Sequence, residues 1–142
     1  MTPAARTFAV TATLLLALAT VVGALNAHAL SGRLGPDEER IVQTAVQYQF
    51  YHALGLLAVA VLMAFMGRQS PGAPRGVGWL TTAGWLLMVG IVLFSGSLYA
   101  LAGGVGGSLR LVVGALTPLG GLSLILAWCA AATGIARVAV SR

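Results

Sequence analysis

The sequence contains no lysine, only three acidic residues and a single cysteine. Charged residues make up 8% of the chain, whereas about 25% is usual for soluble domains, so this composition excludes an ordinary soluble protein. The lone cysteine excludes an internal disulfide bond. All eight basic residues are arginines, and they are scattered rather than clustered, which argues against a nucleic-acid partner despite the net charge of +5.

The chain is instead rich in apolar residues, which make up 58% of it and give a mean hydropathy of +0.94. Four segments lack Asp, Glu, Lys and Arg and are long enough to cross a bilayer, which takes about 20 apolar residues. Strand edges cannot be satisfied in lipid, and these apolar runs do not alternate. We therefore predict an all-α, integral membrane four-helix bundle with up-down-up-down topology, in which residues 1–142 form one transmembrane domain. The predicted helices cover approximately residues 8–30, 46–66, 79–101 and 111–136.

The second helix is predicted to begin before it enters the lipid. Pro36, Asp37 and the two glutamates that follow place a proline and carboxylates in a first helical turn, where both are favourable. The Gly- and Pro-rich stretches at 67–78 and 103–107 are typical of connecting loops.

The arginines predict the orientation of the bundle. Five of them lie on the side of the two termini, and three lie on the other side together with all three acidic residues. Cytoplasmic loops carry the excess of basic residues, so both termini are predicted to be cytoplasmic. A cleaved signal peptide is an alternative for the first segment, because residues 27–29 resemble a cleavage site, but the apolar run is longer than usual for one.

Polar side chains concentrate toward one end of all four predicted helices, which is the outer end in this orientation. Tyr48 and Gln49 precede His52 by four and three residues and so share its helix face. We predict that these polar residues meet at one depth, either as a binding site or as contacts between helices. The predicted cluster consists of His28, Tyr48, Gln49, His52, Ser95, Ser97, Tyr99 and Thr117.

The first helix also carries a stripe of small and polar residues. Such stripes normally face neighbouring helices, where small residues permit close approach and polar residues form hydrogen bonds. We therefore expect this stripe to pack inside the bundle. It consists of Thr13, Ala17, Thr20, Ala24 and His28.

The residue types leave several functions open. His28 and His52 are candidate ligands of a metal ion or haem, or hydrogen-bonding partners of a quinone or another lipid-like ligand, but their spacing identifies no cofactor. The same cluster is equally typical of plain interhelical contacts. A transporter is disfavoured because no acidic residue lies within a predicted span. An enzyme is the least favoured class. The sole candidate for nucleophilic catalysis is a pair of His52 and Ser95, which would need the two side chains to lie at one depth and within hydrogen-bond reach.

Four segments together resemble a known family. Residues 24–30, 48–54, 93–99 and 117–121 are similar, in order and spacing, to the signature segments of the YgdD-like family of small four-helix membrane proteins. This family is also called the domain of unknown function four-two-three and is related to transmembrane protein two-five-six of animals. Leu25 and Asn26 depart from its pattern, which has Phe and Gly there.

The resemblance implies a retained first helix and a location in the bacterial inner membrane, and it implies no activity. Together with the small size of the chain, this favours a non-enzymatic accessory or assembly subunit of a membrane complex. Its expected partners are the lipid bilayer and either another membrane protein or a second copy of the chain. A binding module for a quinone, lipid, haem or metal is the alternative.

Overall fold

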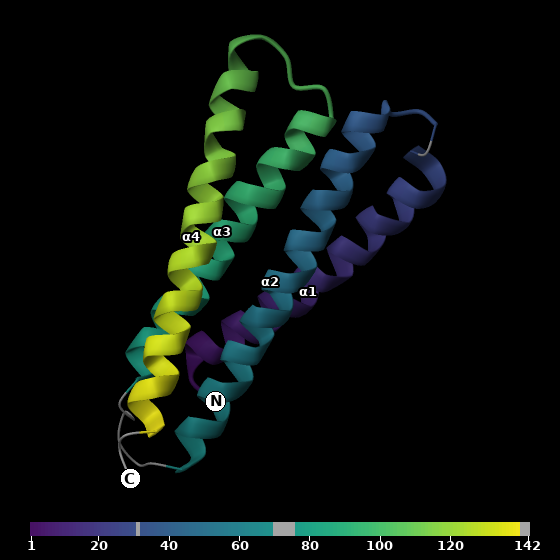
Figure 1. The fold of residues 1–142 in the computed structure, drawn as a ribbon. Helices are drawn as coiled ribbons and strands as arrows, with labels where there is room; N and C mark the ends of the chain where they lie inside the picture. Colours follow the sequence, from purple (N-terminus) through teal and green to yellow (C-terminus); the bar gives the residue numbers. More distant parts are fainter. Residues whose placement is uncertain (31, 70–75, 140–142) are drawn as a thin grey trace.

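The computed structural model describes residues 1–30, 32–69 and 76–139. Within these residues the chain forms four long helices that alternate in direction (Figure 1). Each helix is long and apolar enough to cross a membrane, so the prediction of an all-α membrane four-helix bundle is confirmed. The elements are α1 (Pro3–Leu25), continued by the π-helical turn η1 (Asn26–Leu30), then α2 (Pro36–Gln69), α3 (Val77–Ala102) and α4 (Gly107–Ala139).

The helix starts follow from the local sequence. The side chain of Thr2 accepts a hydrogen bond from the Ala5 N–H at 3.2 Å, which caps α1 in front of a first-turn proline. Helix α2 begins at Pro36 with three acidic residues in its first turn, as predicted. Of the predicted connector at 67–78, residues 67–69 still belong to α2, and residues 70–75 lie outside the described part.

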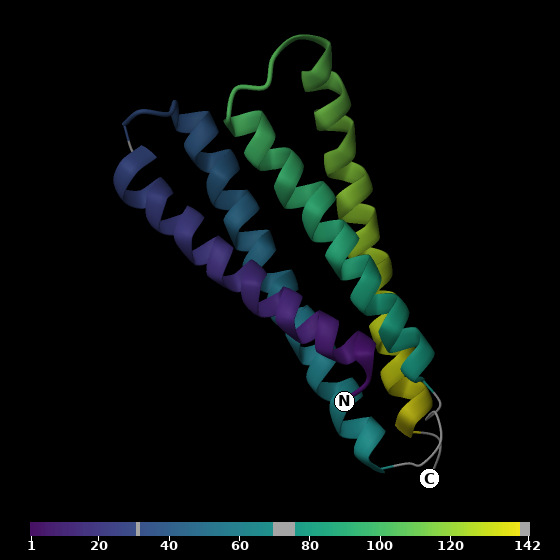
Figure 2. The ribbon, with the colours of Figure 1, turned by 180° about the vertical axis from the view of Figure 1, so that it is seen from behind.

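The helices lie side by side in the order of the sequence, with α2 and α3 in the middle. We call the end with the loops at 32–35 and 103–106 the hairpin end, and the opposite end, where α1 begins, the terminal end. Both views show α1 and α4 diverging toward the hairpin end (Figures 1 and 2). The described parts of α1 and α4 do not pack along one another, so the bundle is open on that side.

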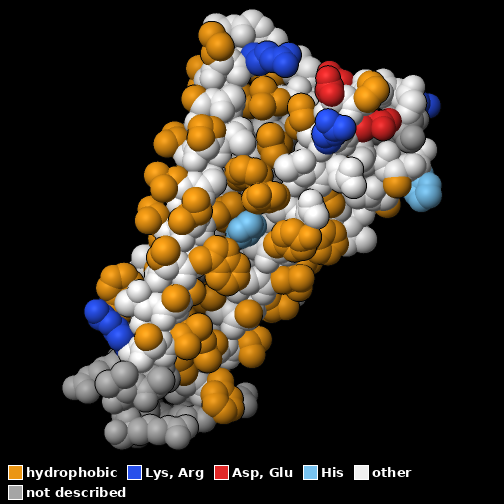
Figure 3. Space-filling model, viewed as in Figure 1, with side chains coloured by type: hydrophobic (Ala, Val, Ile, Leu, Met, Phe, Trp, Pro, Cys, Tyr) orange, Lys and Arg blue, Asp and Glu red, His pale blue; other side chains and the backbone are white. Residues whose placement is uncertain are grey.

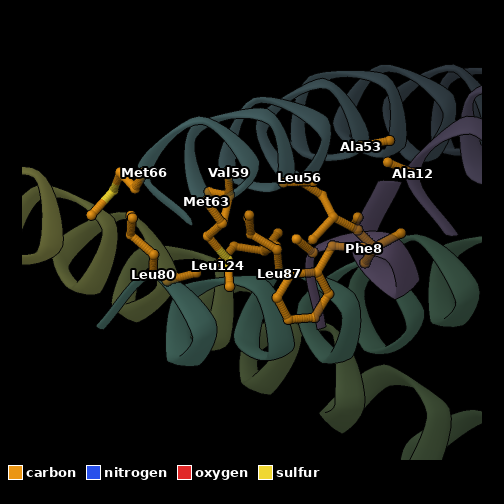
Figure 4. Packing of buried hydrophobic residues seen from close by; sticks show 14 residues of the cluster. Phe8, Ala12, Ala53, Leu56, Val59, Met63, Met66, Leu80, Leu87 and Leu124 are labelled. Atoms are coloured by element: carbon orange, nitrogen blue, oxygen red, sulfur yellow. The ribbon is translucent and has the colours of Figure 1, made fainter. Parts of the chain in front are cut away.

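A core of buried apolar side chains fills the terminal half of the bundle (Figure 4). The fully buried ring of Phe8 reaches α3, where it occupies the space that a Cβ on Gly84 would need. It also meets the ring of Trp85 edge to face at 5.4 Å. Phe8 therefore holds the start of α1 against α3, although α1 packs mainly on α2.

Glycines bring α3 and α4 close together. A Cβ built on Gly120 would lie 2.8 Å from Phe94 Cα and 2.9 Å from the Leu93 carbonyl carbon. Nearer the terminal end, a Cβ on Gly134 would lie 3.1 Å from the Gly76 carbonyl oxygen. These contacts are with backbone atoms, so only residues without a side chain allow the two helices to approach this closely.

The outer surface is apolar on every helix. Leu14 of α1 is 66% exposed, Val61 of α2 is 61% exposed and Leu111 of α4 is 79% exposed. Contiguous exposed apolar surface of this kind destabilises a protein in water but is the normal surface in contact with lipid tails. The side chains of the bundle therefore face lipid over most of its length.

Candidate interhelical polar and aromatic site

Gln49 joins three helices near the middle of the bundle. Its side chain is only 2% exposed. Its Nε2 donates a hydrogen bond to the Leu15 carbonyl oxygen of α1 at 2.8 Å, and its Oε1 accepts one from the Tyr99 hydroxyl of α3 at 2.8 Å. A buried amide is costly unless it is bonded, so these two bonds hold α1, α2 and α3 in one register. The structure thus brings together two of the predicted residues, Gln49 and Tyr99.

A row of four rings crosses from α3 over α2 to α4. Tyr48 stacks on Phe94 with ring centroids 4.5 Å apart and on His52 at 5.7 Å. The His52 ring then meets Trp128 of α4 at 6.1 Å, tilted by 51°. His52 is nearly buried, whereas Tyr48 and Trp128 are 39% and 46% exposed. We call these four residues the aromatic row, and it reaches the lipid-facing surface on both sides of His52.

The hydrogen bond of His52 fixes its tautomer. Its Nδ1 lies 2.7 Å from the Tyr48 carbonyl oxygen, one turn earlier in α2. A carbonyl oxygen only accepts, so Nδ1 carries the proton, and Nε2 of the neutral ring is left as an acceptor. Among the described residues Nε2 has no hydrogen-bond partner. The fully buried side-chain atoms without a partner belong to Asn26 and Ser95, so Nε2 is not fully buried. Nε2 is therefore an acceptor without a partner in the described part of the chain, on a ring that is only 9% exposed.

Ser97 and Thr117 form a second polar contact, between α3 and α4. The Ser97 hydroxyl donates to the Phe94 carbonyl oxygen at 2.8 Å, and its oxygen lies 2.7 Å from the Thr117 hydroxyl. Because the single proton of Ser97 is already engaged, Thr117 donates to Ser97. This pair is a contact between two helices, which is one of the two roles predicted for the polar residues.

Ser95 stands apart from these contacts although it is 1% exposed. Its Oγ has no hydrogen-bond partner within the described part of the chain. The pairing of Ser95 with His52 that catalysis would need is therefore not made, since the His52 Nδ1 bonds to backbone instead. An unbonded buried hydroxyl costs free energy in its own right.

His28 is not brought to the other polar residues. It lies in η1 at the hairpin end and is exposed. His52 follows the start of α2 by sixteen residues, which places it about 24 Å along the helix from that end. The expectation of one depth fails for His28. The start of α2 at Pro36 is as predicted, and it places His52 well away from the hairpin end, where His28 lies. Figure 3 accordingly shows two separate histidine side chains, one of them among hydrophobic groups.

This separation bears on metal and haem binding. Metal–nitrogen bonds are about 2 Å long, so two ligands of one ion must lie within a few ångströms of each other. His28 and His52 do not meet this requirement. The described residues contain no group of three or more His, Cys, Asp or Glu side chains arranged to hold a metal ion.

The predicted inward stripe of α1 faces outward. Thr13 and Thr20 are exposed, and their hydroxyls bond to carbonyl oxygens of α1 itself, for example Thr20 to Leu16 at 2.9 Å. A threonine satisfied within its own helix needs no neighbour, so it tolerates a lipid-facing position. The buried face of α1 is formed by Ala5, Phe8, Ala12 and Ala19.

Two members of the aromatic row were missed by the sequence prediction. Trp128 continues the helical spacing from Thr117 through Gly121 and Leu124, so periodicity within α4 was an available signal. Phe94 gave no comparable signal, because an apolar ring beside Ser95 is ordinary in a membrane helix. The Leu15 carbonyl oxygen is a backbone atom, and no residue type predicts its use by Gln49.

The fold and these contacts define a small four-helix integral membrane protein whose polar groups lie mainly between its helices. The family model described as "Protein of unknown function (DUF423)" matches residues 22–121. The chain belongs to this family, and the resemblance found in its four signature segments is confirmed.

Several curated membrane proteins are similar over most of their length. The "UPF0382 membrane protein YwdK" of Bacillus subtilis is 44% identical over 111 residues, which cover 78% of this chain and 80% of that protein. The "UPF0382 inner membrane protein YgdD" of Escherichia coli K12 is 36% identical over 118 residues, covering 82% and 79%. No solved structure matches the chain.

Proposed function

We propose that this protein is a non-enzymatic accessory or assembly subunit of a complex in the bacterial inner membrane. The observation that carries the proposal is the acceptor of His52 that has no partner among the described residues, beside the partly exposed rings of Tyr48 and Trp128. Lipid tails offer no hydrogen-bond donor. A partner protein that donates a hydrogen bond to this imidazole nitrogen would therefore stabilise the complex. The inner membrane is supported by the name of the similar Escherichia coli protein.

The surroundings of His52 suit a partner helix. Tyr48 and Trp128 flank it and are partly exposed, and aromatic residues are enriched where proteins bind one another. The donor expected from the partner is a Ser, Thr or Tyr hydroxyl or a Trp N–H at the depth of His52.

The variant His52→Phe tests this proposal because it keeps an aromatic ring in the row and removes the acceptor. We expect a partner protein to co-purify with the tagged wild type in mild detergent and to be reduced about tenfold or more by His52→Phe, consistent with loss of one buried hydrogen bond. Quantitative mass spectrometry of the purified material is the measurement. The matched control is His28→Phe, which should retain the partner.

Two outcomes would contradict the accessory-subunit proposal. One is a protein that runs as a monomer without any stoichiometric partner in every mild detergent. The other is a partner retained equally by His52→Phe and wild type. A second copy of the chain as the only partner would instead make the His52 surface a homo-oligomer interface.

The second candidate function is a small-ligand binding module. The tautomer of His52 favours a ligand that donates a hydrogen bond, such as the hydroxyl of a hydroquinone, over a quinone carbonyl, which only accepts. Extraction of the same purified protein, with chromatography against hydroquinone and quinone standards, tests this candidate. A stoichiometric hydroquinone that is lost in His52→Phe supports it, and absence of any bound aromatic ligand contradicts it.

Both termini are proposed to be cytoplasmic, on the distribution of the arginines. With Cys129 replaced by serine, a cysteine added after Arg142 is expected to resist an impermeant maleimide applied to intact spheroplasts. Ser108→Cys, at the hairpin end, is expected to react. The reverse pattern of labelling would overturn the orientation.

A further inference from the structure

An apolar groove lies between α2, α3 and α4 at the hairpin end, apart from the aromatic row. Its volume is about 460 Å³. Arg110, in the first turns of α4, is the one charged residue among those that line it. The lining residues are Ile41, Leu101, Gly107, Arg110, Leu111 and Gly114.

The nearby glutamates are engaged elsewhere. The Glu39 carboxylate accepts a hydrogen bond from the Gly32 N–H at 2.9 Å, and the Glu38 carboxylate lies against Gly35. Both therefore turn toward the loop between α1 and α2. Within the described part of the chain, Arg110 forms no ion pair with these glutamates or with Asp37, so its positive charge at the rim of the groove is available to an anion.

Glycine keeps the floor of the groove open. A Cβ on Gly114 would meet no atom within 4 Å, so the space beside α4 at this point is empty. Gly114 follows Arg110 by four residues, which places it about 6 Å deeper in the membrane. The groove thus combines a cationic rim at the level of the headgroups with an apolar channel below it.

We propose that this groove binds an anionic phospholipid. Its phosphate contacts the Arg110 guanidinium, which matches phosphate oxygens in a bidentate manner, and its acyl chain runs past Leu111 and Gly114. An α-helix is about 10 Å across, so the volume of the groove would hold only about one helical turn. A lipid therefore fits the groove better than a partner helix does. Basic grooves between membrane helices are suited to anionic headgroups.

Titration of the delipidated protein in detergent, followed by native mass spectrometry, tests this proposal. Phosphatidylglycerol and phosphatidylcholine with identical chains are the two probes. We expect wild type to bind phosphatidylglycerol at least about tenfold more tightly, as loss of a charge-assisted hydrogen bond implies. Arg110→Gln should abolish this preference and keep the weaker binding, whereas Gly114→Leu should weaken binding of both lipids by filling the channel.

The control variants separate the groove from the general surface. Gly96→Leu adds the same side chain at an exposed position of α3 where a Cβ would also meet no atom within 4 Å, and Arg33→Gln removes an exposed arginine of the same end. Both should bind lipid as wild type does, and far-UV circular dichroism checks that all variants fold.

Equal affinity of wild type for the two lipids would overturn the proposal, and so would wild-type binding by both Arg110→Gln and Gly114→Leu. Glycerol phosphate, which has no acyl chains, should not compete at millimolar concentration; full competition would make this a phosphate site and not a lipid site. None of these residues belongs to the His52 surface, so the outcome is independent of the proposed subunit role.

Discussion

Gly120→Ala is expected to destabilise the protein by about 1–3 kcal/mol, the usual cost of overpacking. The new methyl group would press on the backbone of Phe94 and Leu93 in α3. A helix backbone does not move aside as a flexible side chain does, so α3 and α4 must separate along their shared interface. That separation also weakens the contact between Ser97 and Thr117, which lies one turn away.

The neighbouring glycine provides the control. A Cβ on Gly121 would lie 3.7 Å from the Phe94 ring, which is ordinary contact. Gly121→Ala should therefore match wild type or be more stable by up to about 1 kcal/mol, because alanine favours the helix. Unfolding of both variants in mixed dodecylmaltoside and dodecyl sulfate micelles, followed by circular dichroism, measures the difference. Equal stability of the two variants would refute the close approach of α3 and α4 at Gly120.

Gln49→Leu is expected to destabilise the bundle by about 1–3 kcal/mol, because it leaves the Tyr99 hydroxyl without its acceptor. The leucine is similar in size, so little of this effect comes from a cavity. The exposed residue Gln47 offers a matched control, since its Nε2 donates to the Tyr51 hydroxyl at 2.9 Å. Gln47→Leu should change stability by less than about 0.5 kcal/mol, as is usual for surface positions.

A double-mutant cycle with Tyr99→Phe isolates the hydrogen bond itself. We expect the two substitutions to be coupled by about 0.6–1.7 kcal/mol, the range for hydrogen bonds between membrane helices. Unfolding in mixed micelles again gives the four free energies of unfolding. Strictly additive effects of Gln49→Leu and Tyr99→Phe would show that the two side chains are not hydrogen-bonded in the folded protein in micelles.

The polar residues were predicted from the sequence better than their grouping was. Gln49, His52 and Tyr99 were selected because polar side chains in apolar helices need partners, and the structure provides those for Gln49 and Tyr99. The sequence analysis groups His28 with them because polar side chains concentrate toward one end of all four predicted helices. The predicted start of α2 at Pro36 already lies sixteen residues before His52, which separates the two histidines along the bundle and leaves His28 at the hairpin end.

Hydropathy, segment length and local motifs are enough to identify this protein as a four-helix membrane protein of its family. The length and hydropathy of a span are properties of one segment, and a bilayer satisfies them without reference to other segments. Helix starts are equally local, because the cap at Thr2 and the first turn at Pro36 depend on adjacent residues. This is why the helix count, the topology and the start of α2 were predicted correctly.

The faces by which the helices meet are not predictable in this way and are known from the packed bundle alone. Lipid tails and a protein core are equally apolar, so hydrophobicity does not distinguish an inward face of a membrane helix from an outward one. Threonine adds to the ambiguity by bonding within its own helix, as Thr13 and Thr20 do. The burial of the alanine face of α1 and the assembly of the aromatic row around His52 depend on shape and contact between distant segments, and therefore appear only when the helices are packed together.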